Sequence, residues 1–190
     1  MAFRMSVTRL YLVRHGRASA GWDTAVDPEL DALGRAQSSQ LAQHLAPLGP
    51  LKVITSPLTR CQQTAEPLCQ AWKTTAQVCN KVAEIPSPHD VPISERVEWL
   101  RTAMSGTWES LGPRYTKFRD DLVKFVWQIS EDTVVVSHFV AINAIIGNIE
   151  GSDRLVLHRL DNCSVTIVER HTDGELQLIE VGREADTLIR

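Results

Sequence analysis

The stretch TRLYLVRHG, residues 8–16, decides the interpretation of this sequence. Residues 8–13 are mostly β-branched, aromatic or aliphatic, which favours a β-strand. The strand must end at Arg14-His15-Gly16, because a charged and a polar side chain precede a glycine that permits a sharp change of direction. We therefore predict a first strand over residues 8–13, followed by a loop that carries Arg14 and His15.

Downstream of this loop, helical and strand-like segments alternate. Asp31 is a suitable N-cap for a helix over roughly Ala32 to Ala46. A short strand over 51–55 is followed by Ser56-Pro57, which has the form of an N-cap and a first-turn proline and predicts the start of a second helix. A third extended segment runs over 76–83.

The segment from about 86 to 130 differs in character, because it holds most of the aromatic residues of the chain. Its apolar residues recur at helical spacing and predict a helical insertion of two helices, the second starting near Pro113. We expect the tryptophans and Phe118 to form the insertion's own core.

The remainder of the chain completes the pattern of an open sheet. Residues 133–136 form a wholly apolar segment typical of a buried parallel strand, and Ser137-His138 leads into another helix. The closing segments 164–168 and 175–179 flank Asp173-Gly174, a hairpin signal. The predicted fold is α/β: a three-layer sandwich with a mainly parallel central sheet, helices on both faces, an antiparallel edge hairpin and the helical insertion.

Length and composition limit the possible classes of protein. The chain of 190 residues fits a single domain over 1–190. A net charge of -3 argues against a nucleic-acid partner, and the apolar runs are too short for a membrane span. The four cysteines show no close pairing and no signal peptide precedes them, so we expect a cytoplasmic protein. No pattern in the sequence specifies an oligomeric state.

Polar side chains follow four of the predicted strands, at the edge where ligands bind in open α/β sheets. Each has a task in the chemistry of a phosphate monoester. Two arginines can grip phosphate oxygens with forked hydrogen bonds, and one neutral imidazole can attack phosphorus while its other nitrogen donates to a backbone carbonyl. A second imidazole, when protonated, adds a third donor, and a carboxylic acid can protonate the leaving oxygen. In chain order the candidates are Arg14, His15, Arg60, Glu84 and His138.

Three of these candidates also have an ordinary structural interpretation. Arg60 would be a surface charge paired with Glu66, and His138 a neutral residue bonded to backbone at a helix N-terminus. Glu84 would be a solvated loop carboxylate. Other acids compete for its role, namely Asp90, Glu95, Glu98 and Glu109.

Taken together, Arg14-His15-Gly16, Arg60, Glu84 and Ser137-His138 resemble the histidine phosphatase superfamily, also called phosphoglycerate mutase-like. The resemblance spans nearly the whole chain. It implies that His15 is phosphorylated, that Arg14, Arg60 and His138 bind phosphate, and that Glu84 is the acid. It implies no metal and no cofactor.

The sequence also departs from the usual pattern of that family. Arg17 and Ala18 replace the Glu or Gln and the hydroxyl or Asn that many members carry after Arg-His-Gly, and Phe139 replaces a small glycine. The segment 85–88 lacks the glycine of the sugar-phosphate mutases. We therefore expect a phosphohydrolase that acts through a phosphohistidine on a small phosphorylated metabolite or a phosphoprotein. The alternatives are a phosphoglycerate mutase-like phosphotransferase and a phosphate-ligand-binding protein with little catalysis.

Overall fold

Six strands form one mixed sheet in the computed structural model, which describes residues 7–21, 23–172 and 174–185. Their order across the sheet is β3-β2-β4-β1-β5-β6. Strands β1 to β4 run parallel to one another. At one edge of the sheet, β5 pairs antiparallel with β1 and β6 pairs antiparallel with β5. The strands are β1 (Thr8–Arg14), β2 (Lys52–Thr55), β3 (Gln77–Val78), β4 (Thr133–Ser137), β5 (Val165–Arg170) and β6 (Leu176–Glu180).

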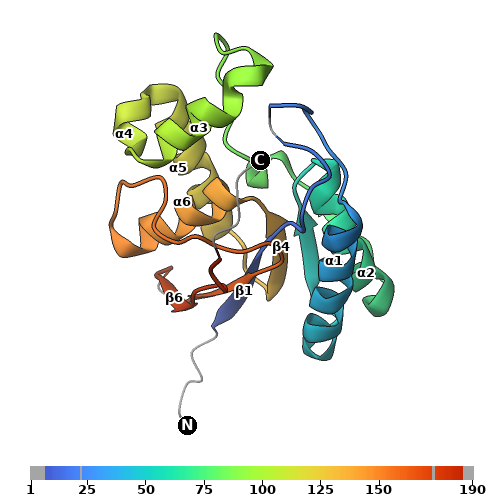
Figure 1. The fold of residues 1–190 in the computed structure, drawn as a ribbon. Helices are drawn as coiled ribbons and strands as arrows, with labels where there is room; N and C mark the ends of the chain where they lie inside the picture. The colour runs from blue at the N-terminus through green and yellow to red at the C-terminus, as the bar shows by residue number, and fades with distance from the viewer. Residues whose placement is uncertain (1–6, 22, 173, 186–190) are drawn as a thin grey trace.

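Helices cover both faces of this sheet (Figure 1). On one face lie α1 (Ala32–Leu45) and α2 (Thr59–Trp72), which pack against each other. On the other lie α5 (Pro113–Trp127) and α6 (Phe139–Glu150), with α3 (Arg96–Met104) and α4 (Trp108–Leu111) beside them. The predicted three-layer α/β architecture is therefore confirmed. Of the predicted hairpin turn, Asp173 lies outside the described residues.

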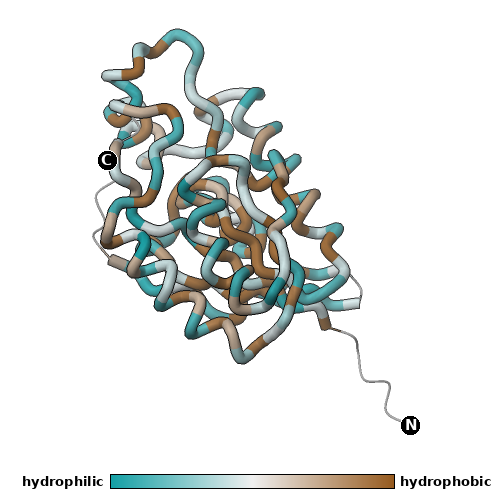
Figure 2. Tube along the Cα trace, turned by 90° about the vertical axis from the view of Figure 1, so that its right-hand side faces the viewer, coloured by the Kyte–Doolittle hydropathy of each residue, from teal (hydrophilic) through white to brown (hydrophobic). Residues whose placement is uncertain are grey.

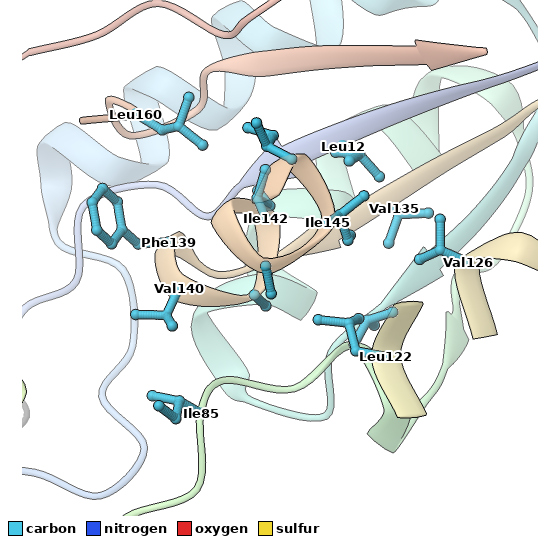
Figure 3. Close-up of a cluster of buried hydrophobic side chains, with 14 of the residues drawn as sticks. Leu12, Ile85, Leu122, Val126, Val135, Phe139, Val140, Ile142, Ile145 and Leu160 are labelled. Atoms are coloured by element: carbon cyan, nitrogen blue, oxygen red, sulfur yellow. The ribbon is translucent and has the colours of Figure 1, made fainter. Parts of the chain in front are cut away.

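The core consists of two apolar clusters, one on each face of the sheet. Because successive strand residues point to opposite faces, Leu10 and Leu12 of β1 join the cluster under α5 and α6, whereas Tyr11 and Val13 join the cluster under α1 and α2. The apolar residues gather in the interior of the chain trace (Figure 2), and the first cluster packs around α6 (Figure 3). Burying each large aliphatic side chain contributes about 1.5–3 kcal/mol. The end of β1 is thus a rigid base for the residues that follow it.

Two boundaries differ from the sequence-based expectation. Helix α2 begins at Thr59 with Leu58 as its N-cap residue, so the prediction that Ser56-Pro57 starts this helix is wrong. The extended segment predicted over 76–83 keeps only the two residues of β3 in the sheet, and a 3-10 turn over Asn80–Val82 follows. Both β3 residues are exposed at the sheet edge, so little apolar burial extends the pairing.

The segment between β3 and β4 holds three α-helices rather than the expected two. The expected start of a helix near Pro113 is confirmed, because α5 begins there. Trp108 is fully buried, and Phe118 packs with it in the cluster that also contains Leu10 and Leu12. These aromatics therefore extend the core of the sheet instead of forming a separate one. Trp127 is 45% exposed and belongs to neither of the two core clusters. No helix in the described ranges is long and apolar enough to cross a membrane.

Candidate active site

The site forms where the carboxyl ends of β1 and β4 lie side by side. Arg14 at the end of β1 is in register with Ser137 at the end of β4. The backbone N–H of His15 donates to the carbonyl of Ser137 at 3.1 Å, and that of Arg14 donates to the carbonyl of Ser164 at 3.2 Å. The backbone of the two motif residues is therefore hydrogen-bonded on both sides.

The His15 side chain is held in one tautomer. Its Nδ1 lies 2.7 Å from the carbonyl oxygen of Gly16 and donates to it, while Nε2 accepts a hydrogen bond from Arg60 Nε at 3.2 Å. Burial lowers the pKa of His15 well below its ordinary value, and the charges of Arg60 and Arg14 lower it further. The imidazole is thus neutral, and Nε2 carries the lone pair that a nucleophile needs.

The Arg14 side chain is buried and fixed from two directions. Its Nη1 donates to the carbonyl of Leu160 at 2.5 Å, and its guanidinium carbon lies 5.0 Å from the ring centroid of Phe139. Phe139 and Leu160 both belong to the core cluster that packs around α6 (Figure 3). Burial lowers the pKa of Arg14 to about 10, so the group is a cation at neutral pH. Phe139, the departure from the family pattern, therefore packs against Arg14.

Arg60 is the second residue of α2, and the residue is 6% exposed. Its Nη2 lies 3.3 Å from His138 Nδ1, and its Nε donates to His15, so it bridges the two imidazoles. The alternative of a surface arginine paired with Glu66 is therefore wrong. The nearest carboxylate contact of Arg60 is Asp27, with Oδ1 at 4.0 Å from Nη1.

His138 is fully buried, and its ring centroid lies 5.2 Å from that of His15. Its Nε2 lies 2.7 Å from Ser56 Oγ, so the assignment that satisfies both ring nitrogens puts the proton on Nε2 and lets Nδ1 accept from Arg60. Burial, and after it the charge of Arg60, lowers the pKa of His138. The lowered pKa favours the neutral ring. A dianion bound beside the ring would raise that pKa.

Glu84 follows β3 and is partly buried. Its Oε1 accepts a hydrogen bond from the N–H of Ile85 at 3.0 Å. Burial raises its pKa above the ordinary value, against the opposing effects of that hydrogen bond and of Arg60 and Arg14. A raised pKa favours the protonated form that a proton donor requires. The four competing carboxylates are all exposed: Asp90, Glu95, Glu98 and Glu109.

The structure thus brings all five predicted residues to one edge of the sheet, together with three side chains that the sequence reasoning did not select. Thr64 Oγ1 accepts from the N–H of Gly16 at 2.9 Å, Asn162 Nδ2 donates to the carbonyl of His15 at 2.9 Å, and Ser56 contacts His138. Thr64 shares a helix face with Arg60 four residues earlier, which was an available signal. Asn162 precedes a strand that runs antiparallel to β1, so no strand-end rule selects it.

Arg17, which replaces an acidic or amide residue of the family pattern, has a local partner. Its Nε lies 2.5 Å from Asp31 Oδ2, and Asp31 also caps α1 by accepting from the N–H of Gly34. The Arg17 charge is therefore neutralised by its own loop. Within the described ranges, no three His, Cys, Asp or Glu side chains are grouped so that they could hold a metal ion.

The chain is similar to one family over most of its length: residues 10–181 match the histidine phosphatase superfamily (branch 1). It is 27% identical over 183 residues to "Probable phosphoglycerate mutase GpmB" of Escherichia coli (strain K12 / DH10B), covering 85% of this chain and 84% of that protein. A solved mycobacterial glucosyl-3-phosphoglycerate phosphatase, in complex with VO3, has a TM-score of 0.74 and 21% identity, covering 94% of this chain and 100% of that one. The structure of phosphoserine phosphatase from Entamoeba histolytica in complex with 3-phosphoglyceric acid has a TM-score of 0.75 and 19% identity, and the match covers 94% of this chain and 98% of that one.

Proposed function

The chain belongs to the histidine phosphatase superfamily, and from that premise we propose that it is a phosphomonoesterase that acts through a phosphohistidine at His15. Its proposed substrate class is a small phosphorylated metabolite, the class named for several proteins of similar fold. A cytoplasmic location accords with its four free cysteines.

The observation that carries this proposal is a pair of unsatisfied cationic donors on the two arginines nearest His15. Among the described residues, Arg14 Nε and Arg60 Nη1 are buried and have no hydrogen-bond partner. Leaving a buried donor unpaired costs about 1–3 kcal/mol, and more for a charged group. A bound phosphate would supply oxygens to both groups and neutralise their charge.

The reaction then proceeds in two transfers. Substrate phosphate draws Arg60 away from His15 Nε2, whose lone pair attacks phosphorus while the bond to the leaving oxygen breaks. The Glu84 carboxyl gives its proton to that oxygen. In the second transfer the Glu84 carboxylate takes a proton from water, the water oxygen attacks phosphorus, and the N–P bond breaks to release inorganic phosphate. Arg14, Arg60 and a protonated His138 hold the three equatorial oxygens, so the proposed reaction is metal-independent.

A phosphomutase is the second candidate, favoured by the similarity to a protein named as a phosphoglycerate mutase. It would use the same first transfer and return the group to a substrate hydroxyl. Discharge of the isolated phosphoenzyme by water, with and without a polyol acceptor such as glycerate, distinguishes the two. A phosphate-binding protein with little catalysis would form no phosphoenzyme at all.

The decisive experiment compares wild type with His15→Ala on p-nitrophenyl phosphate and on a panel of phosphorylated metabolites. The matched control is His44→Ala, since His44 is exposed on α1. We expect acid-labile labelling of wild type and the control from a radiolabelled substrate, and neither labelling nor turnover in His15→Ala. Undiminished hydrolysis by His15→Ala would refute the proposal.

A further inference from the structure

We propose that Asp27, which the sequence reasoning did not select, is a positioning residue for Arg60. It holds the first turn of α2 from outside the helix and thereby directs Arg60 Nη1 toward the phosphate site. The inference rests on the proposed function, because Arg60 is one of the two arginines assigned to phosphate.

Helix α2 depends on Asp27 for its N-terminal cap. Leu58 occupies the N-cap position and offers no side-chain acceptor. Asp27, 32 residues away in the chain, accepts from the backbone N–H of Thr59 at 2.8 Å through Oδ1 and from the Thr59 hydroxyl at 2.7 Å through Oδ2. A carboxylate at this place satisfies an unpaired backbone donor and interacts favourably with the helix dipole.

Arg60 follows Thr59 directly, so whatever fixes Thr59 fixes the origin of the Arg60 side chain. Asp27 Oδ1 lies 4.0 Å from Arg60 Nη1, which is beyond hydrogen-bond range. The carboxylate therefore balances part of the Arg60 charge and leaves the Nη1 donor available to a ligand.

The loop that carries Asp27 is anchored at both ends to the same helix. At its start, Gly16 donates to Thr64 Oγ1 at 2.9 Å. Near its end, Leu30 donates to Gln63 Oε1 at 2.8 Å. The loop thus fastens the residue after His15 to the helix that carries Arg60, and Asp27 is the attachment nearest to that arginine.

Asp27 is suited to this role better than to proton transfer. Both of its oxygens already accept hydrogen bonds from Thr59, so neither is directed at the proposed phosphate site. The acid role remains with Glu84, whose pKa burial raises.

The experiment measures orthovanadate affinity, kcat, KM and the thermal midpoint for wild type, Asp27→Ala and Asp27→Asn. Glu29→Gln is the matched control, because Glu29 lies on the same loop and its exposed carboxylate pairs with Arg35. Asparagine keeps an oxygen acceptor for the Thr59 N–H and is as good an N-cap as aspartate, whereas alanine removes both bonds. Thr59→Val deletes only the hydroxyl bond and applies the same test if Asp27→Ala does not fold.

We expect Asp27→Ala to weaken vanadate binding and raise KM by about tenfold with a smaller change in kcat, and Asp27→Asn to stay within about threefold of wild type. Thr59→Val should show an intermediate loss. Unchanged vanadate affinity in Asp27→Ala, or equal losses in the Asn and Ala variants, would overturn the role of Asp27. A wild type that neither binds vanadate nor hydrolyses any phosphomonoester would instead overturn the proposed function, and this inference with it.

Discussion

The side-chain amide of Asn162 donates to the backbone carbonyl of His15 at 2.9 Å. Next to it, the N–H of Cys163 donates to the carbonyl of Arg14 at 3.0 Å. Cys163 adopts a φ of 55°, in the left-handed region that non-glycine residues seldom occupy. This turn before β5 therefore uses a strained backbone to hold the loop of the proposed nucleophile.

Replacing Asn162 by alanine removes that hydrogen bond and leaves a buried carbonyl unpaired. We expect the free energy of unfolding to fall by about 1–3 kcal/mol and kcat to fall by roughly tenfold or more, because the His15 ring shifts from its attack position. Urea titration and phosphoenzyme formation rates check this. Asn148→Ala, at an exposed position of α6, is the control. A normal rate of phosphoenzyme formation in Asn162→Ala would contradict the positioning role.

The Glu84→Gln variant tests the assignment of the acid. Loss of a general acid costs roughly 100-fold or more on alkyl phosphates, whose alkoxide leaving group needs a proton, and much less on p-nitrophenyl phosphate. In wild type, kcat/KM should fall as pH rises through the raised pKa of Glu84, because the carboxyl loses the required proton. Glu95→Gln, which changes an exposed carboxylate, should retain this dependence. Equal losses on both substrates would point to another acid.

The Ser56→Ala variant removes the oxygen partner of His138 Nε2 at 2.7 Å and leaves Cys61 Sγ, at 3.3 Å, as a weaker sulfur contact. A buried imidazolium needs an acceptor for that proton, so the variant should disfavour protonation of His138 and weaken vanadate binding by about tenfold. The loss should grow as pH rises, because the proton is then harder to take up. Isothermal titration at pH 6 and pH 8 measures this, with exposed Ser39→Ala as control. Affinity equal to wild type at both pH values would show that Ser56 does not support His138.

The two buried histidines predict how stability depends on pH. Their pKa values are lowered in the folded protein, whereas in the unfolded chain they bind protons near the ordinary value of 6.5. As pH falls below 6.5, the unfolded state therefore binds more protons and stability decreases. Glu84 has the opposite effect on stability, because its pKa is raised in the folded protein. We expect the two histidines together to outweigh this single carboxyl group. Urea unfolding at pH 7 and pH 5 should show lower stability at pH 5, with a smaller difference in His138→Asn.

Residues with a local sequence signal were predictable. The apolar runs of β1 and β4 placed Arg14, His15 and His138 at one sheet edge, because parallel strands end together. The N-cap of α1 at Asp31 was equally local. In contrast, the cap of α2 comes from Asp27, and the support of His15 comes from Asn162 at the start of the antiparallel hairpin. Such contacts join residues far apart in the chain and depend on loop paths that periodicity does not determine.

The packing of the aromatic segment was not predictable, for a related reason. Periodicity identified its helices but not the surface against which they pack, so Trp108 was assigned to a separate core. The position of Ser56 before Pro57 similarly predicts a helix cap, but α2 begins only at Thr59. The Ser56 hydroxyl accepts from the N–H of Leu58 before the helix begins and also contacts His138, and the pairing of β2 with β4 brings that second contact about.

The backbone hydrogen bonds of Arg14 and His15 run to β4 on one side and to the turn before β5 on the other. None of these bonds involves α3 or α4, which lie in the segment between β3 and β4. The amino acids at exposed positions of those helices can therefore change without altering the backbone hydrogen bonds that hold Arg14 and His15. In evolutionary terms, one fixed reaction centre can be retained while new substrates are acquired by changes elsewhere in the chain.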